Sequence, residues 1–316
     1  MRLSEDQVAQ YFEDGFLIVE DVFTQDELRP VMDEFEDIVD EWAERLYAAG
    51  KIENKHEGED LYTRLASLEK EWSGIAPLIH NREQTRPRLA GLWSSDNLLD
   101  MVEQFIGPDI SGHPVSVVRT KTPNTPLMTV PWHQDAAYFE EGAEKTLQPT
   151  AWIPFTDVSE KNGTLQVIRG SHKPGTVFPH RPEKETAHAE SWYLYIEEED
   201  LPPGERVVCE MKMGSMLWHR NNLVHRSTEN TSDRVRWSVD IRYQNPGKPT
   251  GLGAIELAPM RKADDPSYRL DWEAWMAHQA GGIQSYRKLD EDDFDYSPQG
   301  PWLDRWQNYR AASAAS

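Results

Sequence analysis

The sequence contains a single cysteine, Cys209, among 316 residues, so an internal disulfide is excluded. A reducing, cytoplasmic location is the simplest expectation for such a chain. No apolar run approaches the roughly 18 residues that a membrane-spanning helix requires. The first residues, Met1–Asp6, also lack the apolar segment of a signal peptide. We therefore expect no membrane partner.

Positive charge is scarce, with 33 Lys and Arg against 55 Asp and Glu and a net charge of −22. An acidic surface repels phosphate backbones, so we expect no nucleic-acid partner. Hydrophobic residues make up 38% and charged residues 28%, which is typical of a globular chain. The length allows a substantial core, and composition leaves a monomer and a homodimer equally open.

The first third of the sequence predicts helices. Capping boxes at Ser4–Gln7 and Thr24–Glu27 each precede apolar residues spaced by three and four, the second series reaching Trp42. Ser94–Asp96 can begin a further helix that Gly107 ends. We expect residues 1–107 to form a mostly helical flank.

The pattern changes at about residue 108 to short β-rich runs separated by turn residues. This spacing predicts a mainly β fold with flanking helices, in which the core is a double-stranded β-helix (a jelly roll, cupin-like). We expect one domain over 1–316, with core 108–245, an insertion at 173–205 and a helical or irregular extension at 246–316. The predicted strands lie at 115–118, 127–130, 150–155, 164–168, 206–209, 215–218 and 235–243.

The stretch 130–139 carries the first candidate metal ligands, His133 and Asp135, with one residue between them. On a β-strand, alternate side chains share a face about 6–7 Å apart, so both could bind one ion. His225, which ends another β-rich segment, is the candidate third ligand. Two histidines and one carboxylate on one side of an ion are typical of non-haem Fe(II) oxygenases.

The strand after His225 alternates in character. Its polar series is Arg234, Arg236, Ser238 and Asp240, and the residues between them are apolar. If the apolar face packs against the helices, the polar face points into the barrel, where a buried arginine needs an anionic partner. A dicarboxylate cosubstrate would fit the arginine fork and the serine hydroxyl. The alternative is that Arg236 pairs only with Asp240.

Taken in order, these motifs resemble the phytanoyl-CoA dioxygenase family of Fe(II)/2-oxoglutarate oxygenases. The resemblance spans roughly residues 4 to 245. The matching segments are Asp14–Val19, Lys121–Pro123, Trp132–Asp135, Asn162–Gly163, Gly170–Lys173, Gly214–Ser215, His225–Ser227, Asn230 and Arg236.

The resemblance implies a role for each matching residue. His133, Asp135 and His225 would bind Fe(II), while Arg236 and Ser238 would bind the distal carboxylate of 2-oxoglutarate. Arg234 is the nearby competitor of Arg236. Lys121 and Trp152 match family positions beside the cosubstrate.

The implied reaction consumes O2 and 2-oxoglutarate, releases succinate and CO2, and hydroxylates a small organic metabolite. Related halogenases have a small residue where this chain has Asp135, so hydroxylation is favoured over chlorination. Desaturation, cyclisation or epimerisation at the same iron centre is the first alternative. A non-catalytic metal-binding jelly roll is the second.

Candidate substrate residues are Arg119, Tyr138, Phe139 and Trp218. For Tyr138 and Phe139, packing at the barrel mouth is an equally good interpretation. The sequence has no basic cluster suited to the diphosphate of coenzyme A, so we expect a small polar substrate rather than an acyl-CoA.

Overall fold

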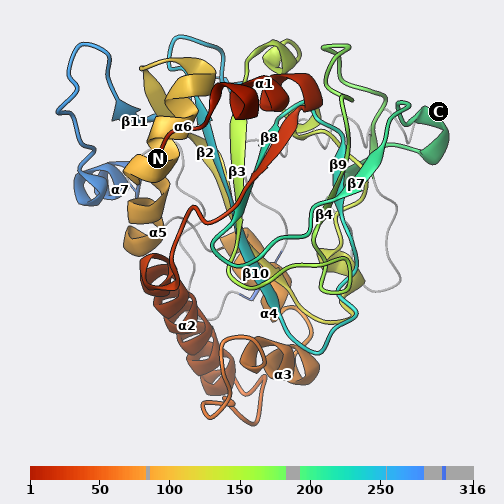
Figure 1. The fold of residues 1–316 in the computed structure, drawn as a ribbon. Coiled ribbons are helices and arrows are strands. Elements are labelled where there is room, and N and C mark those ends of the chain that lie inside the picture. The colour runs from red at the N-terminus through yellow and green to blue at the C-terminus, as the bar shows by residue number, and fades with distance from the viewer. Residues whose placement is uncertain (83–85, 183–192, 254, 281–293, 297–316) are drawn as a thin grey trace.

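The computed structural model describes residues 1–82, 86–182, 193–253, 255–280 and 294–296. Parts of the expected extension at 246–316 lie outside these residues. Two antiparallel sheets face each other, and helices cover the outer face of the larger one (Figure 1). This arrangement confirms the predicted mainly β core with a helical flank.

The larger sheet has the strand order β1-β8-β3-β10-β2-β11, and all its pairings are antiparallel. Strands that follow one another in the sequence are therefore not neighbours in this sheet, as in a jelly roll. The strands are β1 (Phe16–Val19), β2 (Ile110–Lys121), β3 (Pro149–Pro154), β8 (Met216–Arg220), β10 (Arg236–Gln244) and β11 (Ala258–Arg261).

The smaller sheet has the order β7-β4-β9, formed by Arg206–Val208, Leu165–Ile168 and His225–Ser227. His133 extends it through an isolated antiparallel bridge to His225. The insertion at 173–205 contributes a separate two-stranded pair, β5 (Arg181–Pro182) and β6 (Leu194–Tyr195), while residues 183–192 lie outside the described part of the chain.

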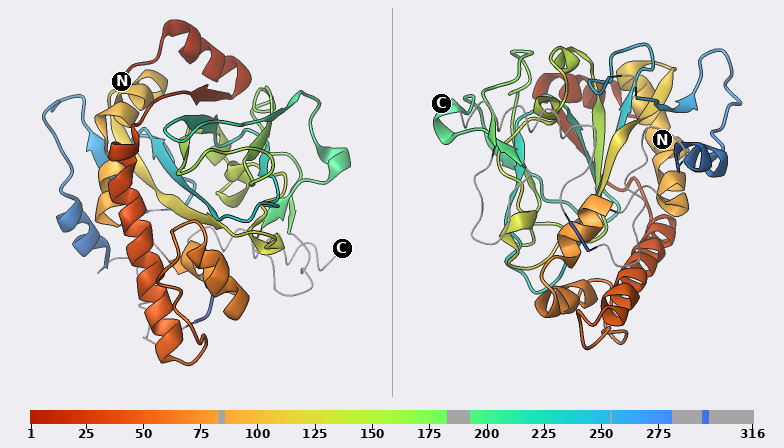
Figure 2. Two further views of the ribbon diagram at one scale, coloured as in Figure 1. Left: turned by 60° about the horizontal axis from the view of Figure 1, so that its bottom comes forward. Right: turned by 180° about the vertical axis from the view of Figure 1, so that it is seen from behind.

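Helices bury their apolar stripes against the larger sheet, and the views in Figure 2 show them on its outer side. Both predicted capping boxes are present, at Ser4 and Thr24. The helices are α1 (Glu5–Asp14), α2 (Gln25–Ala48), α3 (Arg64–Glu71), α4 (Ile75–Arg82), α5 (Pro87–Trp93), α6 (Asp96–Ile106) and α7 (Trp272–Ala280).

Strand β10 joins the helical layer to the barrel interior. Trp237 is fully buried, stacks on Phe35 of α2 at 4.8 Å between ring centres, and donates its indole hydrogen to the carbonyl of Leu61. Its neighbours Arg236 and Ser238 face the opposite side, inside the barrel. The predicted alternation of apolar and polar faces is therefore confirmed for β10.

Three expectations about local structure were wrong. The run 127–130 forms a short 3-10 helix (Pro126–Met128) in place of a strand, and so does the chain after His133 (Asp135–Tyr138). The segment after 246 adds strand β11 to the larger sheet, because Ala258 and Pro259 pair with β2.

No helix among the described residues is long and apolar enough to cross a membrane.

Buried histidines make the stability of the fold dependent on pH. His113 on β2 is completely buried, and burial is the main reason that its pKa falls to about 3. Its Nε2 donates to the carbonyl of Thr250 at 3.2 Å and its Nδ1 accepts from the amide of Val115, as suits a neutral ring. Unfolding would release a histidine with an ordinary pKa near 6.5.

We expect His113 to lower stability as pH falls below about 6.5, because only the unfolded chain then gains its proton. From the pKa difference, this residue should make the free energy of unfolding about 2 kcal/mol smaller at pH 5 than at pH 7. Urea unfolding of the metal-free protein and of His113→Gln at both values measures this. The variant should show a smaller difference between the two pH values, and an equal difference would contradict the assignment.

Candidate metal and cosubstrate site

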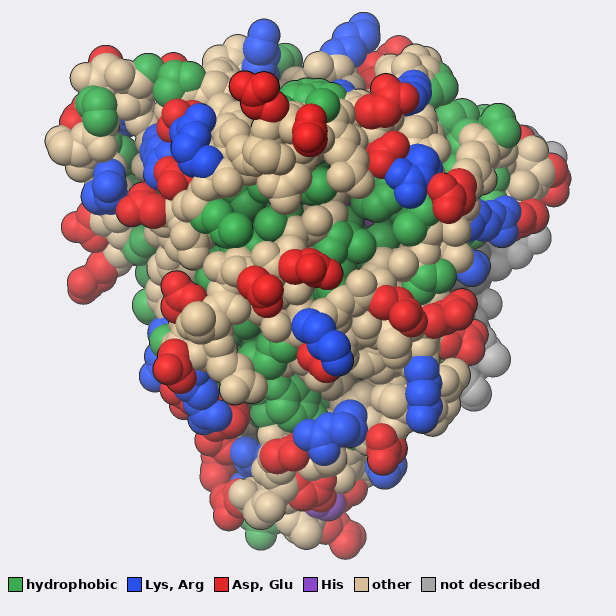
Figure 3. All heavy atoms as spheres, in the orientation of Figure 1, with side chains coloured by type: hydrophobic (Ala, Val, Ile, Leu, Met, Phe, Trp, Pro, Cys, Tyr) green, Lys and Arg blue, Asp and Glu red, His purple; other side chains and the backbone are tan. Residues whose placement is uncertain are grey.

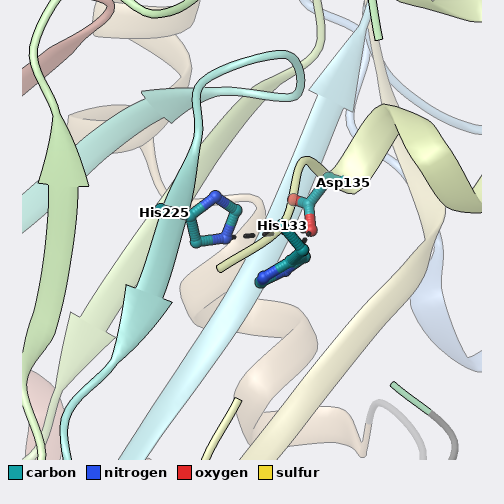
Figure 4. A group of neighbouring side chains, drawn as sticks. All are labelled: His133, Asp135 and His225. Atoms are coloured by element: carbon teal, nitrogen blue, oxygen red, sulfur yellow. Dashed lines mark ion pairs between the residues drawn. The ribbon is translucent and has the colours of Figure 1, made fainter. Parts of the chain in front are cut away.

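Three residues predicted as ligands come together at the end of the smaller sheet (Figure 4). His133 and His225 exchange both backbone hydrogen bonds, each 2.9 Å long, so their side chains leave neighbouring points of the bridge. Asp135 begins the 3-10 helix that follows. The expectation of a continuous strand through His133 and Asp135 was wrong, and the helical turn brings the carboxylate back toward the two rings.

The ligand atoms of the three residues all lie within 4.8 Å of one another. Asp135 Oδ1 is 3.6 Å from His133 Nε2 and 4.0 Å from His225 Nε2. All three side chains are buried. Two imidazole nitrogens and one carboxylate oxygen, converging at this spacing, are a suitable donor set for one Fe(II) ion.

Backbone carbonyls fix the tautomers of both histidines. His133 Nδ1 donates to the carbonyl of Pro131 at 2.8 Å, and His225 Nδ1 donates to the carbonyl of Leu223 at 3.0 Å. A carbonyl can only accept, so the hydrogen lies on Nδ1 and the Nε2 lone pair faces Asp135. Burial, followed by the neighbouring His133 and His219, holds the pKa of His225 well below its usual range. The ring is therefore neutral, the form that binds a metal.

Asp135 has a partner that the sequence interpretation missed. Arg242 donates to Asp135 Oδ2 from Nη2 at 2.8 Å and from Nε at 3.2 Å. Burial raises the pKa of Asp135, but Arg242 and the neighbouring histidines outweigh it and leave the pKa well below its usual value. One more step of the alternation that predicted Arg236, Ser238 and Asp240 would have included Arg242.

A second group of residues lies at the start of β10 and the end of β2, where Arg236 and Lys121 are paired in register. Arg236 is 3% exposed, donates to Ser238 Oγ from Nη1, and lies 5.4 Å above the Trp152 ring. Its Nε is buried and has no hydrogen-bond partner among the described residues. Lys121 Nζ donates to Ser227 Oγ at 2.6 Å.

Neither Arg236 nor Lys121 has an ion-pair partner in the described part of the chain. Burial lowers the pKa of Arg236 to about 9, and burial together with Arg236 lowers the pKa of Lys121 well below its usual range. Burial disfavours the charged form of both side chains, and an anion bound beside them would favour it. A dicarboxylate such as 2-oxoglutarate fits this end of the site.

Two alternatives left open by the sequence are decided by position. Arg234 precedes β10, is 50% exposed, and pairs with Asp60 at 2.9 Å, outside the barrel. Asp240 accepts from Arg119 Nε at 2.8 Å and does not pair with Arg236. Arg236 is thus the arginine that lines the cavity, and Asp240 forms its ion pairs with Arg119 and Arg242 instead.

Residues 11–238 match the phytanoyl-CoA dioxygenase (PhyH) family. This chain belongs to that family. It is an Fe(II)/2-oxoglutarate-dependent oxygenase, since the family match coincides with the two-histidine, one-carboxylate set. The non-catalytic alternative is therefore set aside.

Individual relatives of this oxygenase are distant. A probable alpha-ketoglutarate-dependent hypophosphite dioxygenase of Stutzerimonas stutzeri is 26% identical over 240 residues, which cover 75% of this chain and 77% of the relative. The peroxisomal phytanoyl-CoA dioxygenase of Rattus norvegicus is 25% identical over 245 residues, covering 76% and 68%.

Among solved structures, the non-heme monooxygenase ThoJ in its apo form has a TM-score of 0.61 at 18% identity, and the match covers 97% of this chain and 100% of ThoJ. EctD from S. alaskensis has a TM-score of 0.52 at 18% identity, covering 82% and 87%. These likenesses support the double-stranded β-helix fold of the oxygenase.

One cavity runs from His133 and His225 of the ligand triad to Lys121 and Arg236. It holds about 470 Å³ of empty space, part of it open to solvent. Its polar lining includes Arg119, Lys121, His133, His219, His225, Arg226, Ser227, Arg236 and Asp240, and its apolar lining includes Met128, Val130, Trp152 and Leu165.

Of the four predicted substrate residues, Arg119 lines this cavity. The prediction for Trp218 was wrong: its ring lies in the core beside Phe105, and its indole nitrogen is 3.5 Å from the sulfur of Met101. The next residue of β8, His219, faces the cavity instead, with its ring centre 4.6 Å from that of His225.

Phe139 is buried and Tyr138 is half-buried, and neither is among the described residues that line the cavity. The Tyr138 ring centre is 6.1 Å from that of His133, and its hydroxyl accepts from the amide of Leu194. Phe139 packs on His113 at 5.2 Å. For this pair, the packing interpretation fits better than the substrate-contact interpretation.

Proposed function

We propose that this oxygenase hydroxylates a small polar metabolite, with Fe(II) bound by His133, Asp135 and His225. The observation that carries the proposal is the shared cavity: two members of the buried donor set, His133 and His225, line one end. Arg236 and Lys121, which have no ion-pair partner among the described residues, line the other. A dicarboxylate would bridge the two ends and compensate both cations.

Four residues would hold 2-oxoglutarate. Arg236 offers a planar fork to the distal carboxylate and Ser238 adds a hydroxyl at the same place. Lys121 on β2 would add a second positive charge once a carboxylate is bound beside it, and Trp152 forms a flat wall beneath the Arg236 guanidinium. When bound, Fe(II) and 2-oxoglutarate supply the oxidising chemistry, in which O2 is consumed and succinate and CO2 are released.

The substrate would lie beside Arg119, which is partly buried and faces the cavity. Asp240 fixes this guanidinium through Nε, which leaves its terminal nitrogens to donate to a substrate oxygen. The relatives act, by name, on hypophosphite and phytanoyl-CoA, and an L-proline trans-4-hydroxylase of Streptomyces griseoviridis is 24% identical over 234 residues. The charged and polar lining of this cavity favours a small polar molecule.

A large acyl-CoA fits less well. On the face shown in Figure 3, acidic and basic side chains alternate with small apolar areas, and no broad basic surface faces the viewer. The net charge of −22 would also repel the phosphates of coenzyme A. Asp135, held by Arg242, occupies the position that a halogenase would need for chloride, which supports hydroxylation.

We further infer a single cytoplasmic domain over 1–316, acting as a monomer or homodimer without nucleic-acid or membrane partners. The shared core of the larger sheet and its helices supports one domain. The buried free thiol of Cys209 is compatible with a reducing compartment.

The cosubstrate assignment predicts different outcomes for two nearby arginines. Arg236→Ala should weaken 2-oxoglutarate binding to the Fe(II) protein about 30-fold or more, because a charge-assisted contact of about 2 kcal/mol is lost. Arg234→Ala is the matched control and should leave the affinity within threefold of wild type. Anaerobic calorimetric titration measures both, and the reverse order would transfer the role to Arg234.

The substrate assignment calls for a succinate-release screen over small polar metabolites, followed by mass analysis of each product. A product heavier by one oxygen atom supports hydroxylation. Loss of two hydrogen atoms would identify desaturation or ring closure, and an unchanged mass would identify epimerisation. Turnover confined to acyl-CoA substrates would contradict the proposed substrate class.

A further inference from the structure

Arg242 lies in the barrel interior and has no part in the proposed binding of cosubstrate or substrate. It lies on the polar face of β10, and its side chain is 3% exposed. Two of its nitrogens donate to the same oxygen of Asp135, Oδ2, at 2.8 and 3.2 Å. The other carboxylate oxygen, Oδ1, faces the Nε2 atoms of His133 and His225.

A bulge in β2 fixes the opposite end of the guanidinium. Asp240 pairs with Val117, but Arg242 pairs with His113, so β2 has extra residues between these two positions. Val115 lies in the bulge, and its carbonyl accepts from Arg242 Nη1 at 2.8 Å. Bulges near active sites commonly reorient such groups.

A second carboxylate completes the arrangement. Asp240 Oδ2 is 3.9 Å from Arg242 Nη2 and accepts from Arg119 Nε at 2.8 Å. Arg119, Asp240, Arg242 and Asp135 thus form an alternating series of charges from the cavity to the ligand triad. Alternation keeps each buried charge compensated.

We propose that Arg242 is the positioning residue that orients Asp135, so that Oδ1 alone is presented to the metal. The inference rests on the proposed role of His133, Asp135 and His225 as the iron ligands. Asp135 is in a short 3-10 turn, so the backbone pairing of a strand does not fix the direction of its side chain. The fork of Arg242, anchored on Val115, supplies that constraint.

An orienting role and a purely electrostatic role for Arg242 predict opposite changes in metal affinity when its charge is removed. A cation close to the site repels a divalent ion, so neutralising Arg242 would tighten metal binding if charge were its only effect. Releasing the carboxylate weakens metal binding, typically by 10- to 100-fold when a group that orients a ligand is lost. Lysine keeps the charge but lacks the planar fork that reaches Asp135 and Val115 together.

The test compares Mn(II) affinity, measured by electron paramagnetic resonance, for wild type, Arg242→Lys and Arg242→Gln. Arg234→Lys and Arg234→Gln are matched controls at an exposed arginine and should stay within threefold of wild type. We expect about 10- to 100-fold weaker binding for Arg242→Lys and weaker binding for Arg242→Gln.

Wild-type affinity in Arg242→Lys overturns the inference. If thermal melting shows that Arg242→Lys does not fold, Arg242→Gln decides: weaker binding supports orientation, and equal or tighter binding overturns it. Failure of the wild-type protein to bind Mn(II) would contradict the proposed iron ligands themselves. That result is distinguishable from one in which only the Arg242 variants behave as wild type.

Discussion

The need to compensate charges buried inside the barrel is the constraint on which the site depends. Strand β10 places Arg236, Asp240 and Arg242 in the interior, where an uncompensated charge is very unfavourable. Arg242 is matched by Asp135, and Arg119 by Asp240. Arg236 and Lys121 have no carboxylate partner among the described residues. An anion bound beside them would stabilise their charged forms.

The same strand links this chemistry to the stability of the fold. Residues that alternate with the charged series, such as Trp237 and Val239, are buried against the helices on the other face of the sheet. A one-residue slip of β10 would exchange the two faces and place charges in the apolar core. The helical layer therefore fixes the register that aims Arg236 and Arg242 into the barrel.

Motif order and the alternation of polar and apolar residues predicted much of the site. Motif order predicts that His133, Asp135 and His225 come together, and the alternation of β10 predicts that Arg236 and Ser238 share one face. The choice between Arg236 and Arg234 could not be made from alternation, which assigns both to one face. It depends on where β10 begins, and strand boundaries leave little trace in sequence.

Other features lacked a periodic signal. Strand β8 is buried on both faces, so nothing in its run of large residues shows that Trp218 faces the helices and His219 the cavity. The 3-10 turn at Asp135 is too short to show a period, and its residues resemble a strand. The bulge at Val115 could not be predicted from the sequence either, because it depends on the pairing of β2 with β10.

The most direct test of the account is an anaerobic titration of the protein with Fe(II) and then 2-oxoglutarate, followed by visible absorption. Wild type should develop the weak charge-transfer band of a chelated 2-oxoglutarate, and so should His278→Ala, which alters an exposed histidine. His225→Ala should develop none. Absence of the band in wild type, or an undiminished band in His225→Ala, would contradict the assigned iron and 2-oxoglutarate site.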